Sequence, residues 1–83
     1  MGLADRILWV DLATVVSELR GRGSRVPKLL EVTTNTAIFA QTNERNELLR
    51  DGLSYPVRLR NGKVNVHELF QALKRLGWPG AWV

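Results

Sequence analysis

Cysteine is absent from this chain of 83 residues, which excludes both a disulfide framework and a metal site built on thiolates. Histidine is nearly absent too: His67 is the only one, and no second ligand stands at a metal-binding spacing from it. No apolar run approaches the roughly 20 residues that a membrane-spanning helix needs. We therefore expect no metal, no cofactor and no membrane contact, and a cytoplasmic location.

Nucleophile and phosphate-binding motifs are also missing. Neither Ser17 nor Ser54 lies in a G-x-S-x-G motif, and the glycines near 21–25 lack the G-x-x-x-x-G-K-[ST] spacing of a phosphate-binding loop. Glu44 and Glu47 are expected to solvate a helix face or to pair with arginine rather than to act as acid and base. The sequence therefore predicts a protein that is not an enzyme and takes no small-molecule substrate.

The charge balance favours a polyanionic partner. The formal net charge is +4 and the sequence pI is about 10.4, and arginine outnumbers lysine. Each phosphate that a basic side chain neutralises releases counterions, so nucleic acid is the first expected partner. The basic loop 21–25 would lay Arg22 and Arg25 along a phosphate backbone, although surplus basic residues also serve solubility and such a loop can be a solvated connector.

The length allows a single domain with a limited core, and a hydrophobic content of 45% argues against disorder. Within the domain 1–83 we distinguish an N-terminal helix with its basic loop (1–25), a central unit (34–76) and a tryptophan-containing tail (77–83).

The strongest local signal is a β-hairpin. Two runs of alternating apolar and polar residues flank Asn61-Gly62, a pair that suits the positive φ angles of a type I′ turn. Side chains alternate across a strand, so the apolar residues are expected on one face of the hairpin. The other face would carry Arg58, Arg60 and Lys63.

The sequence predicts two amphipathic helices, and for each of them it also indicates the residue at which the helix begins. The first covers about 11–20, with Asp11 as its expected N-cap. The second covers 66–76, with Asn65 as the N-cap and Glu68 as its partner in a capping box.

The middle of the chain is ambiguous. Residues 30–40 would form either a strand or a short helix that starts at about Asn35, and we favour the helix. Thr42-Asn43-Glu44 is typical of a helix start, and Gly52 is typical of a helix end. A further short helix is therefore expected over 43–51.

With these elements, 34–76 would run as short helix, turn, short helix, β-hairpin and helix. The segment LLRDGLSYPVRLRNGKVNVHELFQAL resembles the small winged-helix DNA-binding proteins of the phage excisionase and MerR type. The matching positions are Arg50, Gly52, Pro56, Arg58, Arg60, Lys63 and the helix from Val66. The resemblance implies an α+β fold, namely a small winged helix-turn-helix-like domain of helices plus a β-hairpin wing.

The same resemblance implies a DNA-binding protein, such as a phage or mobile-element regulator of transcription or a recombination accessory factor. The helix over 43–51 would enter the major groove of double-stranded DNA, and the wing would contact phosphates or an adjacent minor groove. The implied base contacts are Asn43, Arg45, Asn46 and Arg50, and the implied wing contacts are Arg58, Arg60 and Lys63.

Other interpretations stay open. The chain would alternatively be a protein-interaction module, either a small inhibitor or an assembly subunit, in which Trp78 and Trp82 contact a partner or a second copy in a homodimer. In a third interpretation, Ile7–Val10 and Leu30–Ala40 pair as strands of a compact α+β sheet. The basic residues of the hairpin have a structural alternative as well, because charges on an edge strand prevent it from pairing with other molecules.

Overall fold

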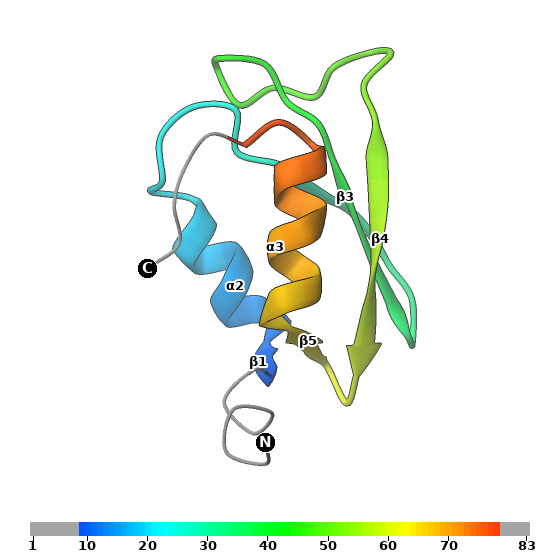
Figure 1. Ribbon diagram of the computed structural model, residues 1–83. Helices are drawn as coiled ribbons and strands as arrows, with labels where there is room; N and C mark the ends of the chain where they lie inside the picture. Colours follow the sequence, from blue (N-terminus) through cyan, green and yellow to red (C-terminus); the bar gives the residue numbers. More distant parts are fainter. Residues whose placement is uncertain (1–8, 79–83) are drawn as a thin grey trace.

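The computed structural model describes residues 9–78 of the protein, which fold into two layers (Figure 1). Within these residues one layer is a five-stranded antiparallel sheet and the other consists of two helices. The strands lie in the order β1-β5-β4-β3-β2, so β1 and β2 form the edges. The elements are β1 (Trp9–Asp11), α2 (Leu12–Leu19), β2 (Lys28–Val32), β3 (Thr36–Ala40), β4 (Ser54–Arg60), β5 (Lys63–Asn65) and α3 (Val66–Arg75).

This mostly β architecture shows that the predicted winged helix-turn-helix is wrong. The two short helices expected in the middle of the chain do not form: one is replaced by β3, and 43–51 is a series of turns. β3 pairs with β2 on one side and with β4 on the other. Its β-branched and aromatic residues, Ile38 and Phe39, gain packing from two neighbouring strands that an isolated helix would not supply. Tertiary pairing therefore decided the structure of this segment.

The predicted β4–β5 hairpin is confirmed in its turn and in its faces. Asn61 and Gly62 have φ angles of 53° and 76°, as a type I′ turn requires. Leu59 lies opposite Val64, and Arg60 lies opposite Lys63. Leu59 and Val64 are buried, whereas the two basic residues are exposed.

The hairpin is not a projecting wing, however, because strands flank it on both sides. β5 pairs with β1 and β4 pairs with β3. Even the tip is tied down, since the backbone N–H of Leu12 donates to the carbonyl of Gly62 at 3.0 Å. β4 is the central strand of the sheet and has no free edge. The alternative that its arginines keep an edge strand from pairing with other molecules is therefore also wrong.

The core lies between the helices and one face of the sheet. α2 and α3 lie on the same side of the strands (Figure 1). Alternate residues of β3 and β4, such as Ala37 and Val57, point into this core and are 0% exposed. Its other large, fully buried side chains are Val15, Phe39, Val64, Leu69, Leu73 and Leu76.

The start of α3 combines a predicted cap with an unpredicted contact. The side-chain oxygen of Asn65 accepts from the N–H groups of His67 at 3.0 Å and Glu68 at 3.2 Å, which confirms the N-cap. Glu68 does not complete a capping box. Its carboxylate accepts instead from the backbone N–H of Arg58 at 2.6 Å and pairs with the Arg58 guanidinium at 3.4 Å. β5 is only three residues long and does not pair with Arg58 of β4. The Glu68 carboxylate accepts the backbone hydrogen bond that β5 would otherwise provide.

The N-terminal part also departs from two expectations. The helix over 11–20 is confirmed as α2, but Asp11 makes no side-chain capping bond. The third interpretation expected a strand over Ile7–Val10, of which Ile7 and Leu8 lie outside the described residues. The observed strand is Trp9–Asp11, and it pairs with β5 and not with residues 30–40. In residues 9–78, neither helix is long and apolar enough to cross a membrane.

The bond between Glu68 and the backbone of β4 leads to a stability prediction. Glu68→Ala should lower the free energy of unfolding by about 1–2 kcal/mol, because the N–H of Arg58 loses its acceptor. Arg58→Ala removes only an exposed ion pair and should cost under about 0.5 kcal/mol. Urea unfolding of both variants tests this, with Glu68→Gln as a control that keeps an acceptor oxygen. Equal destabilisation by the two alanine variants would contradict the role of the backbone bond.

Candidate nucleic-acid interface

The face of the sheet that the helices leave uncovered carries the basic residues of the hairpin. Arg60 and Lys63 are cross-strand neighbours, and Arg58 lies two residues from Arg60 on the same face of β4. We call these three residues the basic face. The structure thus brings the three predicted wing residues together, at the end of the sheet where β4 turns into β5. Asp11 lies opposite Lys63 in β1 and lowers the positive charge of this end.

Trp9 adds an aromatic ring that was missed in the sequence. The guanidinium of Arg60 lies over the Trp9 ring, 5.1 Å from its centroid, and Trp9, Arg58 and Arg60 line the same shallow hollow. Trp9 is far from the hairpin in sequence and reaches it only because β1 pairs with β5. The one available signal was the alternation in Trp9-Val10-Asp11, which is too short to assign a strand or its partner.

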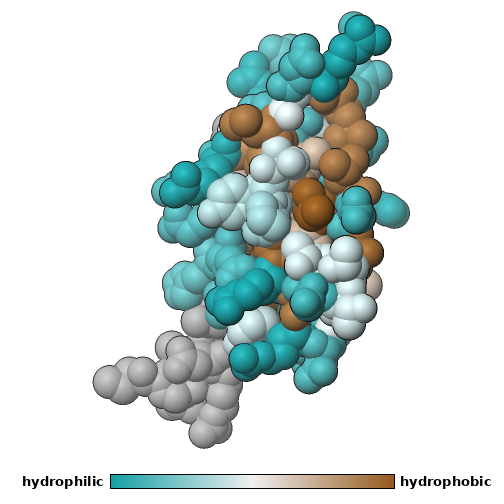
Figure 2. Space-filling view, turned by 90° about the vertical axis from the view of Figure 1, so that its right-hand side faces the viewer, coloured by the Kyte–Doolittle hydropathy of each residue, from teal (hydrophilic) through white to brown (hydrophobic). Residues whose placement is uncertain are grey.

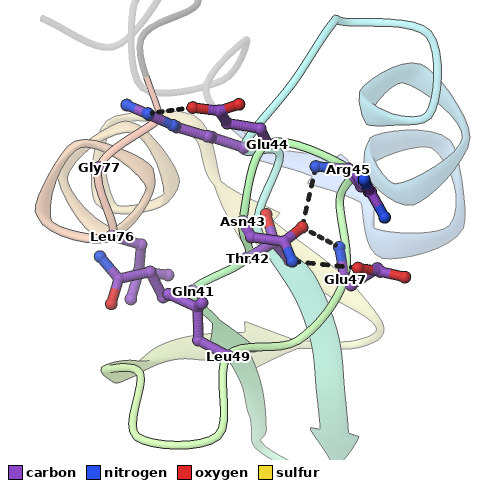
Figure 3. Close-up of a pocket in the computed structure, with 10 residues that line it drawn as sticks. Gln41, Thr42, Asn43, Glu44, Arg45, Glu47, Leu49, Leu76 and Gly77 are labelled. Atoms are coloured by element: carbon purple, nitrogen blue, oxygen red, sulfur yellow. Dashed lines mark hydrogen bonds and ion pairs between the residues drawn. The ribbon is translucent and has the colours of Figure 1, made fainter.

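The four predicted base contacts lie in the loop 41–53, and two of them have structural roles. The side-chain oxygen of Asn43 accepts from the N–H groups of Arg45 at 2.8 Å and Glu47 at 3.0 Å, and its amide donates to the Glu47 carboxylate (Figure 3). Such local bonds give the backbone an alternative to a helix, as asparagine commonly does. The residue that was taken for a helix start therefore organises a turn.

Asn46 connects this loop to the loop before β2. Its side chain accepts from the N–H of Val26 at 2.8 Å and donates to the carbonyl of Gly23 at 2.8 Å. Nearby, the buried hydroxyl of Thr42 donates to the Val26 carbonyl at 2.9 Å. Both side-chain amides that were expected to contact bases are thus engaged within the protein.

Arg45 and Arg50 are exposed, but they lie far from the basic face. The loop 41–53 precedes β4, whereas the basic face lies near the end of β4, and the two lie at opposite ends of the sheet in Figure 1. A seven-residue strand spans roughly 20 Å. The structure therefore does not join the two predicted groups of contacts into one surface.

The other predicted contacts are distributed over the molecule. Arg22 pairs with Glu18 at 3.4 Å, and Arg25 pairs with Glu44 at 3.1 Å, so both members of the basic loop are engaged with carboxylates. Trp78 is 6% exposed and packs in the core, which removes its ring from the surface. Trp82 lies outside the described residues.

A second hollow, of about 550 Å³, opens between the loop 41–53 and the end of α3, where Leu76 and Gly77 form one wall (Figure 3). Both of its carboxylates have partners: Glu44 forms an ion pair with Arg25, and Glu47 accepts a hydrogen bond from the Asn43 amide. No group of three or more potential metal ligands occurs among residues 9–78. Both carboxylates of the hollow are thus held by neighbouring side chains.

No protein-family model, curated protein or solved structure matches the chain. The basic face and the surrounding loops are therefore the features of the molecule that point to a function.

The double contact of Asn46 generates a second stability prediction. Asn46 has a φ angle of 62°, which costs most residues about 1–2 kcal/mol but not glycine. Asn46→Ala should lower the free energy of unfolding by about 2–3 kcal/mol, because it loses two hydrogen bonds and strains the backbone. Asn46→Gly should cost about 1 kcal/mol less. The exposed neighbour variant Arg45→Ala is the control, and a similar loss in Arg45→Ala and Asn46→Ala on urea unfolding would refute this role.

Proposed function

We propose that the protein binds nucleic acid without catalysing a reaction, and that it holds the phosphate backbone of DNA against its basic face. The observation that carries the proposal is the placement of Arg58, Arg60 and Lys63 on adjoining positions of an uncovered sheet face. Three cations within neighbouring positions create a local positive potential that a polyanion neutralises.

The availability of these cations supports the proposal. Among the described residues neither Arg60 nor Lys63 has an ion-pair partner, in contrast to Arg22 and Arg25. Arg58 pairs with Glu68, yet its side chain is 81% exposed, so the guanidinium can still donate to a phosphate oxygen. The fork of arginine suits phosphate geometry better than an ammonium group does.

The expected contact holds the backbone rather than reading the sequence. Phosphate contacts fix the orientation of a protein on nucleic acid and carry no direct sequence information. With no recognition helix over 43–51, and with Asn43 and Asn46 engaged in loop bonds, we propose no base-reading role for that segment. A role as a phage or mobile-element regulator depended on the winged-helix resemblance and loses that support.

The charge of the basic face can be tested directly. In the variant Arg58→Ala/Arg60→Ala/Lys63→Ala, affinity for a DNA duplex should fall at least about tenfold, and the slope of log affinity against log salt should flatten by about 2–3. Fluorescence anisotropy over a series of salt concentrations measures both, with a single strand of the same sequence as a second probe.

A matched control removes the same charge elsewhere. Arg20→Ala/Arg50→Ala/Lys74→Ala also deletes three exposed cations, which lie just after α2, in the loop 41–53 and on α3. This variant should retain most of the affinity and the salt slope. If the two triple variants lose affinity equally, the basic face is not the binding site, and if the wild-type protein binds neither probe, the proposed function is wrong.

A further inference from the structure

The edge strand β2 is the second unusual surface of the molecule. β2 pairs with β3 on one side, and no strand of the described chain pairs with its other side. It carries two of the large apolar side chains that are exposed to solvent, Leu30 at 54% and Val32 at 49% exposure. An uncovered strand edge with apolar side chains can pair with another strand through backbone hydrogen bonds.

Apolar surface continues from this edge onto both faces of the sheet. On the uncovered face, hydrophobic side chains gather along the centre and the right-hand side of the view in Figure 2. Ile38 of β3 and Pro56 of β4 are cross-strand neighbours on that face. On the helix side, a hollow of about 350 Å³ between α2 and β2 is lined by Val16, Leu19 and Leu29 among others. A strand added at β2 would cover part of both surfaces.

The charges of β2 identify the strand that fits. Lys28 and Glu31 are exposed, and within residues 9–78 neither forms an ion pair. They are three residues apart, which normally places side chains on opposite faces of a strand. The bulge between Leu29 and Glu31 changes this: Lys28 lies opposite Ala40 and Glu31 lies opposite Ile38, two residues on the same face of β3.

One edge that carries a cation and an anion on the same face is complementary to itself. If two copies of β2 run antiparallel around a two-fold axis, Lys28 of each copy can lie opposite Glu31 of the other. The two ion pairs form together, because the symmetry repeats every contact. In this register Leu29 lies opposite Leu30 of the second copy, at the centre of the contact.

We infer that β2 is a docking edge for a second copy of this chain, and that the two copies form a continuous ten-stranded antiparallel sheet. A two-fold axis perpendicular to the sheet keeps both sets of helices on one side and both uncovered faces on the other. The dimer would therefore present two basic faces in the same direction. The inference rests on β2 and is independent of the proposed nucleic-acid binding.

Charge exchange at β2 tests the edge and its register together. By sedimentation equilibrium, the full chain should be a dimer. Lys28→Glu and Glu31→Lys should each raise its dissociation constant at least about tenfold, because each variant places two like-charged pairs across the axis. An equimolar mixture of the two variants should dimerise like the wild type, since every pair in the mixed dimer is again of opposite charge. The double variant Lys28→Glu/Glu31→Lys should do so as well.

These outcomes separate a disrupted contact from a disrupted fold. Recovery in the mixture is possible only if both single variants are folded, and circular dichroism gives an independent check. A monomeric wild-type protein would overturn the inference. It would mean that the bulge keeps β2 from pairing with a second copy of the chain, so that the edge stays free or binds a different protein. A dimer that is unaffected by the single variants, or one that the mixture does not restore, would overturn the β2 contact.

Discussion

The structure depends on the fact that its two helices cover only one face of the sheet. Alternation along β3, β4 and β5 then decides the fate of each side chain: Ala37, Val57 and Val64 enter the core, and their neighbours face the other way. The basic face is the consequence of this alternation at the end of β4. A shift of the register by one residue would bury its three cations, so the same constraint that forms the core also presents the charge.

Polar side chains complete the backbone hydrogen bonding wherever the short elements end. Glu68 accepts from β4 where β5 stops, and Asn65 caps α3. Asn43 and Asn46 organise the loop 41–53 and connect it to the loop before β2. In a chain this small the core is limited, so these bonds at the ends of the elements add to its stability. These side chains therefore have structural roles although they look like contact residues in the sequence.

The uncovered side of the molecule divides into two regions of different chemistry. Cations gather near the β4–β5 turn, beside the ring of Trp9, and hydrophobic side chains gather along the centre and the right-hand side of the view in Figure 2. The first region suits a polyanion and the second suits another sheet edge. The two proposed contacts use different strands, so a symmetric pair of chains as we infer it would offer an extended nucleic acid two binding sites at once.

Local signals were sufficient wherever the structure is itself local. The Asn61-Gly62 turn, the faces of the hairpin, the Asn65 cap and the two helices follow from residues close together in the sequence, and so does the separation of Arg58, Arg60 and Lys63 from the core. Only tertiary structure decided the rest. Residues 36–40 became a strand because β2 and β4 lie on either side, and 43–51 became turns because side chains bond to its backbone and to a distant loop. Trp9 reached the basic face through a pairing that spans most of the chain, and no short-range pattern specifies such a pairing.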